Sequence, residues 1–338
     1  MKKVLACAIA IALVAGVVFA GGSKEAGSTK AAPAKFAWYF PAPHPYGDAV
    51  RKGAEAFAKD YGVEVKFQVG PDWNMDSENT GMLALAADGY NYFSAYPADA
   101  SAANGLYDQI VKRGGKVVNF GASTFEPTPA SFAVMTDVKQ AAKDAAEFVI
   151  GKMGKKGTLV NVLEVLEDPN TKLRKDGIDE VVKNYPDVKV IEVAGIKSEQ
   201  EAVDKITGAV AQAGGYVEGI ICTGFVPTVA LSKILTDYET KYKKHIAGVG
   251  IDDDPVILNA IRGGYLDATI AQNPYGHGYL SLLALKLMSE GYKPVAGAYQ
   301  INAGTAIVTK ANVDSYAADL TKVTNQIKAD LTTKYLTK

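Results

Sequence analysis

The sequence predicts an α/β protein made of two doubly wound parallel sheets that follow one another along the chain. Three observations lead to this fold class. Short apolar runs of strand length alternate with longer segments of helical period, as is typical of βαβ series. The chain has 338 residues, which is enough for two domains of ordinary size. Its hydrophobic content of 48% is sufficient for two packed cores.

The first predicted series begins at residue 36, after a polar segment without hydrophobic pattern. Each helix follows one strand and precedes the next, so we expect parallel strands with helices on both faces of the sheet. The predicted strands are 36–40, 63–69, 90–95 and 116–120, and the predicted helices are 45–61, 77–87 and 102–114.

A second series follows an apparent break. Its predicted strands are 132–135, 159–163, 188–193, 219–222 and 245–251, and its predicted helices are 139–153, 172–184, 199–212 and 227–238. Two such halves in one chain imply a cleft between them. Because ligands bind beyond the carboxyl ends of strands in open parallel sheets, the residues after each strand are the candidates for function.

The end of the second series carries two polar strand ends. The first is Asp252, and Asp254 with Pro255 then starts a helix, since Asp caps free N–H groups and proline suits the first helical position. The helix is predicted over 256–262 and ends at a pair of glycines. A strand over 266–271 then ends at Gln272. We expect the Asp252 and Gln272 side chains to face one cleft and to hold one small polar ligand.

The N-terminus predicts export. Two lysines precede an apolar run that ends in small residues, which matches a cleavable secretory signal over 1–20. Residues 21–35 are small and polar, which is the composition of a flexible tether. Cleavage removes Cys7, and the apolar neighbours of Cys222 predict a buried thiol, with a reactive thiol as the alternative.

Charge and motifs exclude several functional classes. The formal net charge is −1, without the clustered basic excess of a nucleic-acid surface. His44, His245 and His277 form no zinc motif, and there is no Walker A loop and no GxSxG elbow. The acids at 252–254 point in alternating directions, which disfavours a cation site. We therefore expect no metal, no cofactor and no enzymatic activity.

Aromatic and charged side chains at strand ends are the candidate ligand contacts. Aromatic faces suit the C–H face of a sugar ring or an apolar ligand edge, although a core role is as consistent with Trp38 and Phe40. A guanidinium supplies planar donors to hydroxyls, and a carboxylate supplies acceptors. The candidates are Tyr39, His44, Tyr46 and Tyr96 in the first half, and Arg174, Phe225, Asp252 and Gln272 in the second.

At these residues the sequence resembles the type I periplasmic sugar-binding proteins of ABC importers, the ribose- and galactose-binding class. The resemblance extends over nearly all of residues 36–310, and it rests on the order and spacing of several short segments taken together. The segments are 44–46, 174–178, 249–252, 269–272 and 302–310 with 312–314.

The resemblance implies two lobes joined by a three-segment hinge, with crossings near Thr136, Gln272 and Asn302. The implied lobes are 36–136 plus 273–301 and 137–272 plus 302–338. The implied roles are a turn residue at His44, a stacking aromatic at Tyr46, a sugar-binding arginine at Arg174, an acid at Asp252 and a hinge amide at Gln272.

The sequence also departs from the family pattern. Where ribose binders carry an Asp-Arg pair and an Asn, this chain has Gly121, Ala122 and Gly224. A second stacking aromatic is missing near Ile196 and Lys197. We therefore expect a ligand other than ribose in its usual pose, such as a larger sugar, a polyol or a less hydroxylated molecule.

Taken together, the sequence predicts a periplasmic, monomeric solute-binding protein that delivers a sugar or polyol to the membrane permease of an ABC transporter. One alternative is a sensor that presents its ligand to a chemotaxis or signalling receptor. Another is a secreted enzyme of unrecognised type. A lac-repressor-type regulator of the same fold is excluded, because a signal and a tether stand where a DNA-binding helix-turn-helix is needed.

Overall fold

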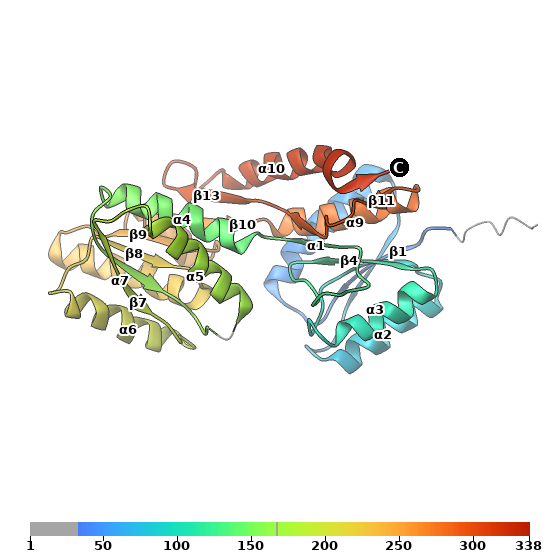
Figure 1. Ribbon diagram of the computed structural model, residues 1–338, viewed down its shortest axis with the longest axis horizontal. Coiled ribbons are helices and arrows are strands. Elements are labelled where there is room, and N and C mark those ends of the chain that lie inside the picture. Colours follow the sequence, from blue (N-terminus) through green and yellow to red (C-terminus); the bar gives the residue numbers. More distant parts are fainter. Residues whose placement is uncertain (1–32, 167) are drawn as a thin grey trace, which may run out of the picture. The chain divides into compact units, whose positions relative to one another are not determined.

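A computed structural model describes residues 33–338 except residue 167 (Figure 1). The predicted signal peptide and most of the predicted tether lie outside the described residues. Within the described part of the chain, the strands form two six-stranded sheets and one two-stranded sheet. No helix in this part is both long enough and apolar enough to cross a membrane.

All strands of the first sheet run parallel, in the order β12-β5-β4-β3-β1-β2. Its strands are β1 Phe36–Phe40, β2 Val65–Val69, β3 Tyr92–Ala95, β4 Lys116–Phe120, β5 Phe132–Met135 and β12 Gln300–Asn302. Its helices are α1 Pro45–Tyr61, α2 Met75–Ala87, α3 Ala103–Lys112 and α9 Pro274–Ser289.

The second sheet has the order β13-β10-β9-β8-β6-β7, and only β13 runs antiparallel to its neighbour among these strands. Its strands are β6 Gly157–Val162, β7 Val188–Val193, β8 Gly219–Cys222, β9 Ala247–Ile251, β10 Ala268–Gln272 and β13 Thr305–Thr309. Its helices are α4 Val138–Lys152, α5 Pro169–Val182, α6 Glu199–Gln212, α7 Phe225–Tyr242 and α8 Pro255–Gly263.

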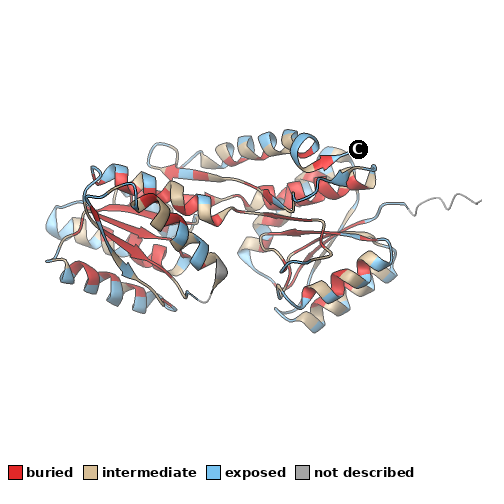
Figure 2. Cartoon of the chain, viewed as in Figure 1, coloured by how far each residue is buried: buried red, intermediate tan, exposed pale blue. Residues whose placement is uncertain are grey.

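Helices cover both faces of each sheet, which is why the central strands are mostly apolar, with Ser94, Asn119 and Asn161 as buried polar exceptions. In the first sheet, α1 and α9 pack on one face, and α2 and α3 on the other. In the second sheet, α4 and α5 cover one face, and α6, α7 and α8 cover the other. Figure 2 shows the central strands buried, whereas most helices are buried only along the side that faces a sheet. The predicted fold class is confirmed.

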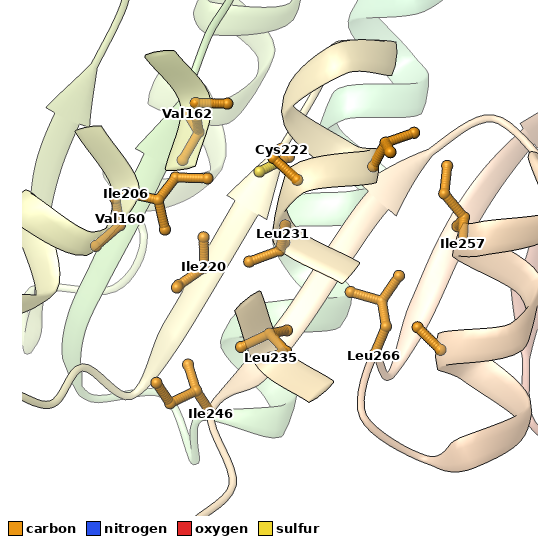
Figure 3. Close-up of a cluster of buried hydrophobic side chains, with 14 of the residues drawn as sticks. Val160, Val162, Ile206, Ile220, Cys222, Leu231, Leu235, Ile246, Ile257 and Leu266 are labelled. Atoms are coloured by element: carbon orange, nitrogen blue, oxygen red, sulfur yellow. The ribbon is translucent and has the colours of Figure 1, made fainter. Parts of the chain in front are cut away.

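Cys222 lies in the core of the second sheet, as predicted. Its side chain is fully buried among apolar neighbours that include Ile220 and Leu231 (Figure 3). Burial raises the pKa of this thiol well above its ordinary value, so it stays protonated. It therefore packs as a small hydrophobic residue.

The chain passes between the two sheets three times, after β5, after β10 and between β12 and β13. Hydrogen bonds tie these three crossing segments together. The Asn302 side chain accepts from Asp137 N at 3.2 Å and from Gly304 N at 2.9 Å. The Asn273 side chain donates to Ala303 O at 2.8 Å. Buried amide side chains thus satisfy the backbone groups that irregular crossing segments leave open.

Some features differ from the prediction. The alternation of strands and helices placed 132–135 at the start of the second series, whereas the resemblance implied a first lobe over 36–136 that includes it. The structure places it in the first sheet as β5, paired in parallel with β4. Helix α7 runs over Phe225–Tyr242 rather than 227–238, because Gly224 serves as its N-cap and the helix continues to a left-handed residue, Lys243.

The C-terminal segment packs against the core of the first sheet. It follows helix α10, Tyr316–Asp330, and consists of the π-helix η1, Leu331–Tyr335, and β14, Leu336–Thr337, which pairs with β11, Lys293–Pro294. Leu331 and Leu336 are buried in the core beside α1 and α9. This packing differs from the expected assignment of all of 302–338 to the second lobe.

Candidate functional site

A cavity of about 300 Å³ lies at the carboxyl ends of strands from both sheets, in the size range of small-molecule sites. The first sheet contributes residues that follow β1 to β5, and the second contributes the start of α5 and the end of β10. The lining residues are His44, Tyr46, Trp73, Tyr96, Gly121, Met135, Thr136, Val138, Asn170, Arg174 and Gln272.

Aromatic rings form the wall from the first sheet. Trp73 contacts Phe40 and Tyr96 edge-on, each with ring centroids 5.3 Å apart. Tyr46 meets Tyr96 at 6.2 Å in the same type of arrangement. Edge-to-face contacts of this kind fix ring orientations and contribute about 0.5–1.5 kcal/mol each beyond area burial. Since 48% of Trp73 is exposed, part of its ring surface is open to a ligand.

His44 begins helix α1 at the edge of the aromatic wall. Its Nδ1 accepts a hydrogen bond from Tyr46 N at 3.1 Å, and Pro45 occupies the first helical position. The resemblance implied that His44 is a turn residue that contacts the ligand. The structure gives it a defined structural role as an N-cap, and its ring still lines the cavity.

Tyr46 is the aromatic residue with the most constrained hydroxyl. Its Oη lies 2.8 Å from Nδ1 of the buried His277. Burial raises the pKa of the Tyr46 phenol well above its ordinary value, and the nearby Tyr96 and Asp252 add to the effect. A Cβ on residue 121 would stand 2.1 Å from this oxygen, and Gly121 also has a left-handed φ of 72°. Glycine at 121 therefore provides the space that the Tyr46 hydroxyl fills.

Arg174 brings positive charge to the cavity from the second turn of α5. Asp168 caps this helix by accepting from Asn170 N and Thr171 N, and Pro169 follows it. Among the described residues, the Arg174 side chain has no hydrogen bond and no ion pair within 4 Å. Its five N–H donors are thus available to a ligand.

Asp252 and Gln272 are brought together, as expected from the sequence. Gln272 Nε2 donates to Asp252 Oδ1 at 2.9 Å. Gln272 lines the cavity directly, and Asp252 lies next to it, at the end of β9. Burial raises the pKa of Asp252, while the Gln272 amide and the positive charge of Arg174 oppose the shift.

The backbone at Asp252 is strained. Its φ is 68°, in the left-handed region that Asp enters more readily than most side chains. Two hydrogen bonds hold it to β10: Asp252 N donates to Ile270 O at 3.0 Å, and Thr269 Oγ1 donates to Asp252 O at 2.7 Å. Strain of this kind persists where surrounding contacts fix one geometry, which is common at binding sites.

Glu164, after β6, adds a second acid beside Arg174 and Asp252. A Cβ on residue 224 would stand 2.3 Å from its Cδ, so Gly224 leaves the space that the Glu164 side chain fills. Its Oε1 accepts from Val226 N at 3.4 Å. Burial raises the pKa of this carboxyl, and the hydrogen bond from Val226 and the charge of Arg174 act in the opposite direction.

Three predicted contact residues are not among those that line the cavity: Tyr39, Phe225 and Asp252, whose Oδ1 is bonded to the lining residue Gln272. Tyr39 is 1% exposed, packs in the core under α2 and α3, and donates its hydroxyl to Ser77 O at 3.4 Å. Its position inside β1 points it toward the helices rather than beyond the strand end. Phe225 begins α7 and is 47% exposed, but it lies outside the lining.

The cavity also contains residues that the sequence analysis did not select. Trp73 and Asn170 line it, and so does Thr136 from the first crossing segment. Trp73 lies shortly after the strand predicted over 63–69. It is therefore one of the residues beyond a strand end, where ligand contacts are expected. Thr136 and Glu164 come directly after the strands predicted over 132–135 and 159–163, so the same expectation applies to both. It does not give their neighbours, because those depend on packing between distant segments.

The acids at 252–254 are engaged separately. Asp253 accepts from Tyr316 Oη at 2.7 Å, and Asp254 caps α8 by accepting from Val256 N at 2.8 Å. Over residues 33–338 without 167, no group of three or more His, Cys, Asp or Glu side chains is arranged to hold a metal ion.

A second depression, of about 530 Å³, lies between α6 and α7 on the second sheet. Ile220, Ile234 and Ile246 are typical of its mostly apolar lining, and its charged residues, Asp237 and Lys241, are few. It lies away from the strand ends where polar groups converge. We therefore place the candidate site in the cavity beside Tyr46 and Arg174.

Comparison with known families gives a match over most of the chain. Residues 38–293 match the family described as periplasmic binding protein domain. The D-allose-binding periplasmic protein of Escherichia coli is 24% identical over 275 residues, which are 74% of this chain and 81% of that protein. The xylitol-binding protein of Mycolicibacterium smegmatis is 23% identical over 66% of this chain and 63% of its own length.

A further relative matches over a shorter stretch. The xylose/arabinose-binding protein of Sulfolobus acidocaldarius is 28% identical over 153 residues, 44% of this chain and 36% of that protein. The matches to it and to the xylitol-binding protein thus span about a third and just under two thirds of those proteins.

Solved structures share the fold. A sugar-binding protein of a sugar ABC transporter from Bacillus halodurans superposes with a TM-score of 0.74 at 20% identity, covering 84% of this chain and 99% of that one. An arabinose-binding protein from Geobacillus stearothermophilus gives a TM-score of 0.73 at 20% identity, covering 83% and 99%.

Proposed function

The chain belongs to the periplasmic binding protein domain family, and we propose that it binds a monosaccharide or a related polyol without chemical turnover. The observation that carries this proposal is the division of the cavity. Aromatic surface around Trp73 lies on one side. On the other side, the Asp252–Gln272 pair and Arg174, which has no ion pair within the described part of the chain, supply donors and acceptors.

The polar groups suit neighbouring hydroxyls. Arg174 donates, while Asp252 Oδ2 has no hydrogen-bond partner within the described residues and can accept. Each hydrogen bond to a charged group contributes roughly 1.5–3 kcal/mol. Three or four of them are enough for micromolar binding after the costs of ordering. Trp73, Tyr46 and Tyr96 would cover the C–H face of the ring.

The two glycines that depart from the ribose-binder pattern sharpen the choice of ligand. Tyr46 fills the space at Gly121, and Glu164 fills the space at Gly224. The site therefore replaces two family positions with a phenol and a carboxylate that reach in from other elements. This supports a polyhydroxylated ligand bound in another pose than ribose, in line with the xylose, xylitol and allose named for the relatives.

We place this binding outside the cytoplasm, in the delivery of the ligand to the permease of an ABC transporter. The relatives' names, which include periplasmic and ABC-transporter proteins, support this role. The three crossing segments provide a hinge. Because ligand groups are shared between both sheets, a closed state binds the ligand better than an open state, and binding shifts the population toward closure.

The test is calorimetry of the mature chain against D-xylose, L-arabinose, xylitol, D-allose and myo-inositol. Native mass spectrometry of gently purified protein complements it by detecting any co-purified molecule. We expect micromolar or tighter binding of at least one probe and no converted product after prolonged incubation. Absence of binding to all polyols, or the appearance of product, would contradict the proposal.

A further inference from the structure

Tyr46 and Thr136 both line the cavity and are connected behind it by one histidine. Tyr46 Oη lies 2.8 Å from His277 Nδ1, and Thr136 Oγ1 lies 3.4 Å from His277 Nε2. His277, on the first turn of α9, is 1% exposed, and Thr136, after β5, is 3% exposed. Three segments distant in sequence thus form one buried chain of polar atoms whose two ends reach the ligand cavity.

His277 is neutral in this chain. Burial lowers its pKa to about 3, and no carboxylate is hydrogen-bonded to it among the described residues. Its two ring nitrogens face hydroxyl groups only, and the Tyr46 phenol, whose pKa is raised by burial, keeps its proton. The connection is therefore made of three neutral groups across the ordinary pH range.

A neutral imidazole has one N–H donor and one acceptor nitrogen. The two hydroxyls must consequently play opposite roles. One hydroxyl donates its hydrogen bond to the acceptor nitrogen of the ring and offers only lone pairs to the cavity. The other accepts the ring N–H and keeps its own proton free to donate. The histidine tautomer decides which is which.

The contact distances favour one tautomer. A phenol is a stronger donor than an aliphatic hydroxyl, and 2.8 Å is typical of a hydroxyl donor, whereas the contact to Thr136 is longer. We propose that His277, as its Nε2–H tautomer, makes Tyr46 an acceptor and Thr136 a donor toward the ligand. His277 is then a positioning residue for specificity, and this inference rests on the proposed function.

The arrangement predicts the ligand chemistry. A ligand hydroxyl next to Tyr46 must donate, because both Tyr46 and the nearby Asp252 accept. A ligand oxygen next to Thr136 must accept, as must one next to Arg174. Replacement of the first hydroxyl by fluorine, which cannot donate, should weaken binding at least tenfold. The same replacement at the oxygen beside Thr136 should cost threefold or less, because fluorine retains weak acceptor character.

The tautomer can be measured without any ligand. Two-dimensional ¹⁵N NMR on protein labelled at histidine distinguishes Nε2–H, Nδ1–H and imidazolium forms. His277→Gln identifies the signal. His245 serves as an internal comparison, because it is exposed, and although burial lowers its pKa, the hydrogen bonds to Glu239 and Asp267 raise that pKa by more. We expect a pure Nε2–H pattern for His277 from pH 8 to pH 5. An Nδ1–H pattern, or an imidazolium at pH 5, overturns the proposal.

The ligand side is tested with deoxyfluoro analogues of the best-binding sugar of the panel. In the native chain, one analogue should lose at least tenfold in affinity, and in Tyr46→Phe the penalty for that same analogue should shrink to about twofold. Thr136→Val should weaken the parent sugar, and Thr136→Ser should restore it, since serine retains the donor. A purely structural role of these residues would lower affinity for all analogues equally, which would overturn the proposal.

Failure of the proposed function gives a different result. If no polyol binds at all, the proposed function and the ligand part of this inference both fall. The NMR measurement then still decides whether His277 fixes opposite roles for the two hydroxyls.

Discussion

The two sheets place their buried acids differently. In the first sheet, Glu78 is completely buried behind the aromatic wall, where its Oε2 accepts from Ala98 N at 2.8 Å and Tyr107 Oη donates to Oε1 at 3.5 Å. In the second sheet, Asp252 and Glu164 stand at strand ends beside Arg174. One acid supports the loop that carries Tyr96, and the other two face the ligand side.

This difference indicates which kind of ligand contact each sheet provides. The first sheet provides shape, because its side chains there are rings in edge-on contact and its acid is used internally. The second sheet provides charge: Arg174 has no hydrogen bond or ion pair among the described residues, and Asp252 Oδ1 accepts from the Gln272 amide. A ligand that needs both a flat apolar face and directed hydroxyls would be bound by both sheets at once.

The largest effect on stability is expected for the buried acid Glu78. Burial raises the pKa of Glu78 to about 7 from its ordinary 4.5, so the folded protein binds this proton more tightly than the unfolded chain. Stability therefore falls as the pH rises from about 4.5 to about 7, by about 3 kcal/mol in total. Glu78→Gln removes this cost and should raise the free energy of unfolding in urea at pH 8, with little change at pH 4.

The matched control for Glu78 is Glu180, a carboxyl whose pKa is lowered in the folded protein instead of raised. Lys139 and Lys143 hold the pKa of the partly exposed Glu180 at about 2. The contribution of Glu180 to stability is therefore present above about pH 4.5 and is lost as the pH falls toward 2. Glu180→Gln should be neutral or slightly destabilising at pH 8. If both variants shift stability in the same direction at pH 8, the account of Glu78 is wrong.

The next largest effect concerns the acid at the ligand side. Asp252→Asn keeps the size of the side chain and its tolerance for a left-handed φ, but it removes the charge. We expect roughly tenfold to hundredfold weaker binding of the best panel sugar by calorimetry. Asp253→Asn, which alters the neighbouring carboxylate bonded to Tyr316, should change affinity less than twofold. Equal losses of affinity in both variants would mean that negative charge near the cavity supports binding, and that direct contact between Asp252 and the ligand does not.

A smaller effect is expected for the aromatic wall. Trp73→Ala should weaken sugar binding by roughly threefold to tenfold, which corresponds to the loss of one aromatic contact. Its effect on thermal stability should be small, since the side chain is half exposed. Phe125→Ala removes an exposed ring that does not line the cavity and should leave affinity unchanged. A Trp73→Ala variant with native affinity would remove Trp73 from the proposed site.

The smallest effect is expected at Phe225. Its ring lies outside the cavity lining, so Phe225→Ala should change affinity less than twofold. A loss of tenfold or more would mean that the Phe225 ring contacts the ligand, as the sequence analysis expected.

Local patterns were sufficient for the fold and for part of the site. The αβ alternation, the cap at Asp254 and the apolar setting of Cys222 depend on neighbours in sequence, and the structure confirms each. Asp252 and Gln272 were paired correctly, because both end strands of one sheet and β9 and β10 are adjacent.

The remaining features depend on contacts between distant segments. The predicted strand 36–40 already contains Tyr39, but the pattern does not show what covers its side chain. Only packing against α2 and α3 shows that Tyr39 belongs to the core. The alternation of strands and helices does not assign 132–135 to the first sheet. Its parallel pairing with β4 does.

The sequence by itself determined the two α/β halves and the carboxylate and amide at adjacent strand ends, because hydrophobic period and capping act over a few residues. The tertiary structure decided which side chains fill the spaces at Gly121 and Gly224, and that a buried His277 connects Tyr46 to Thr136. These contacts join segments up to 231 residues apart, and close packing, which no local pattern encodes, brings them together.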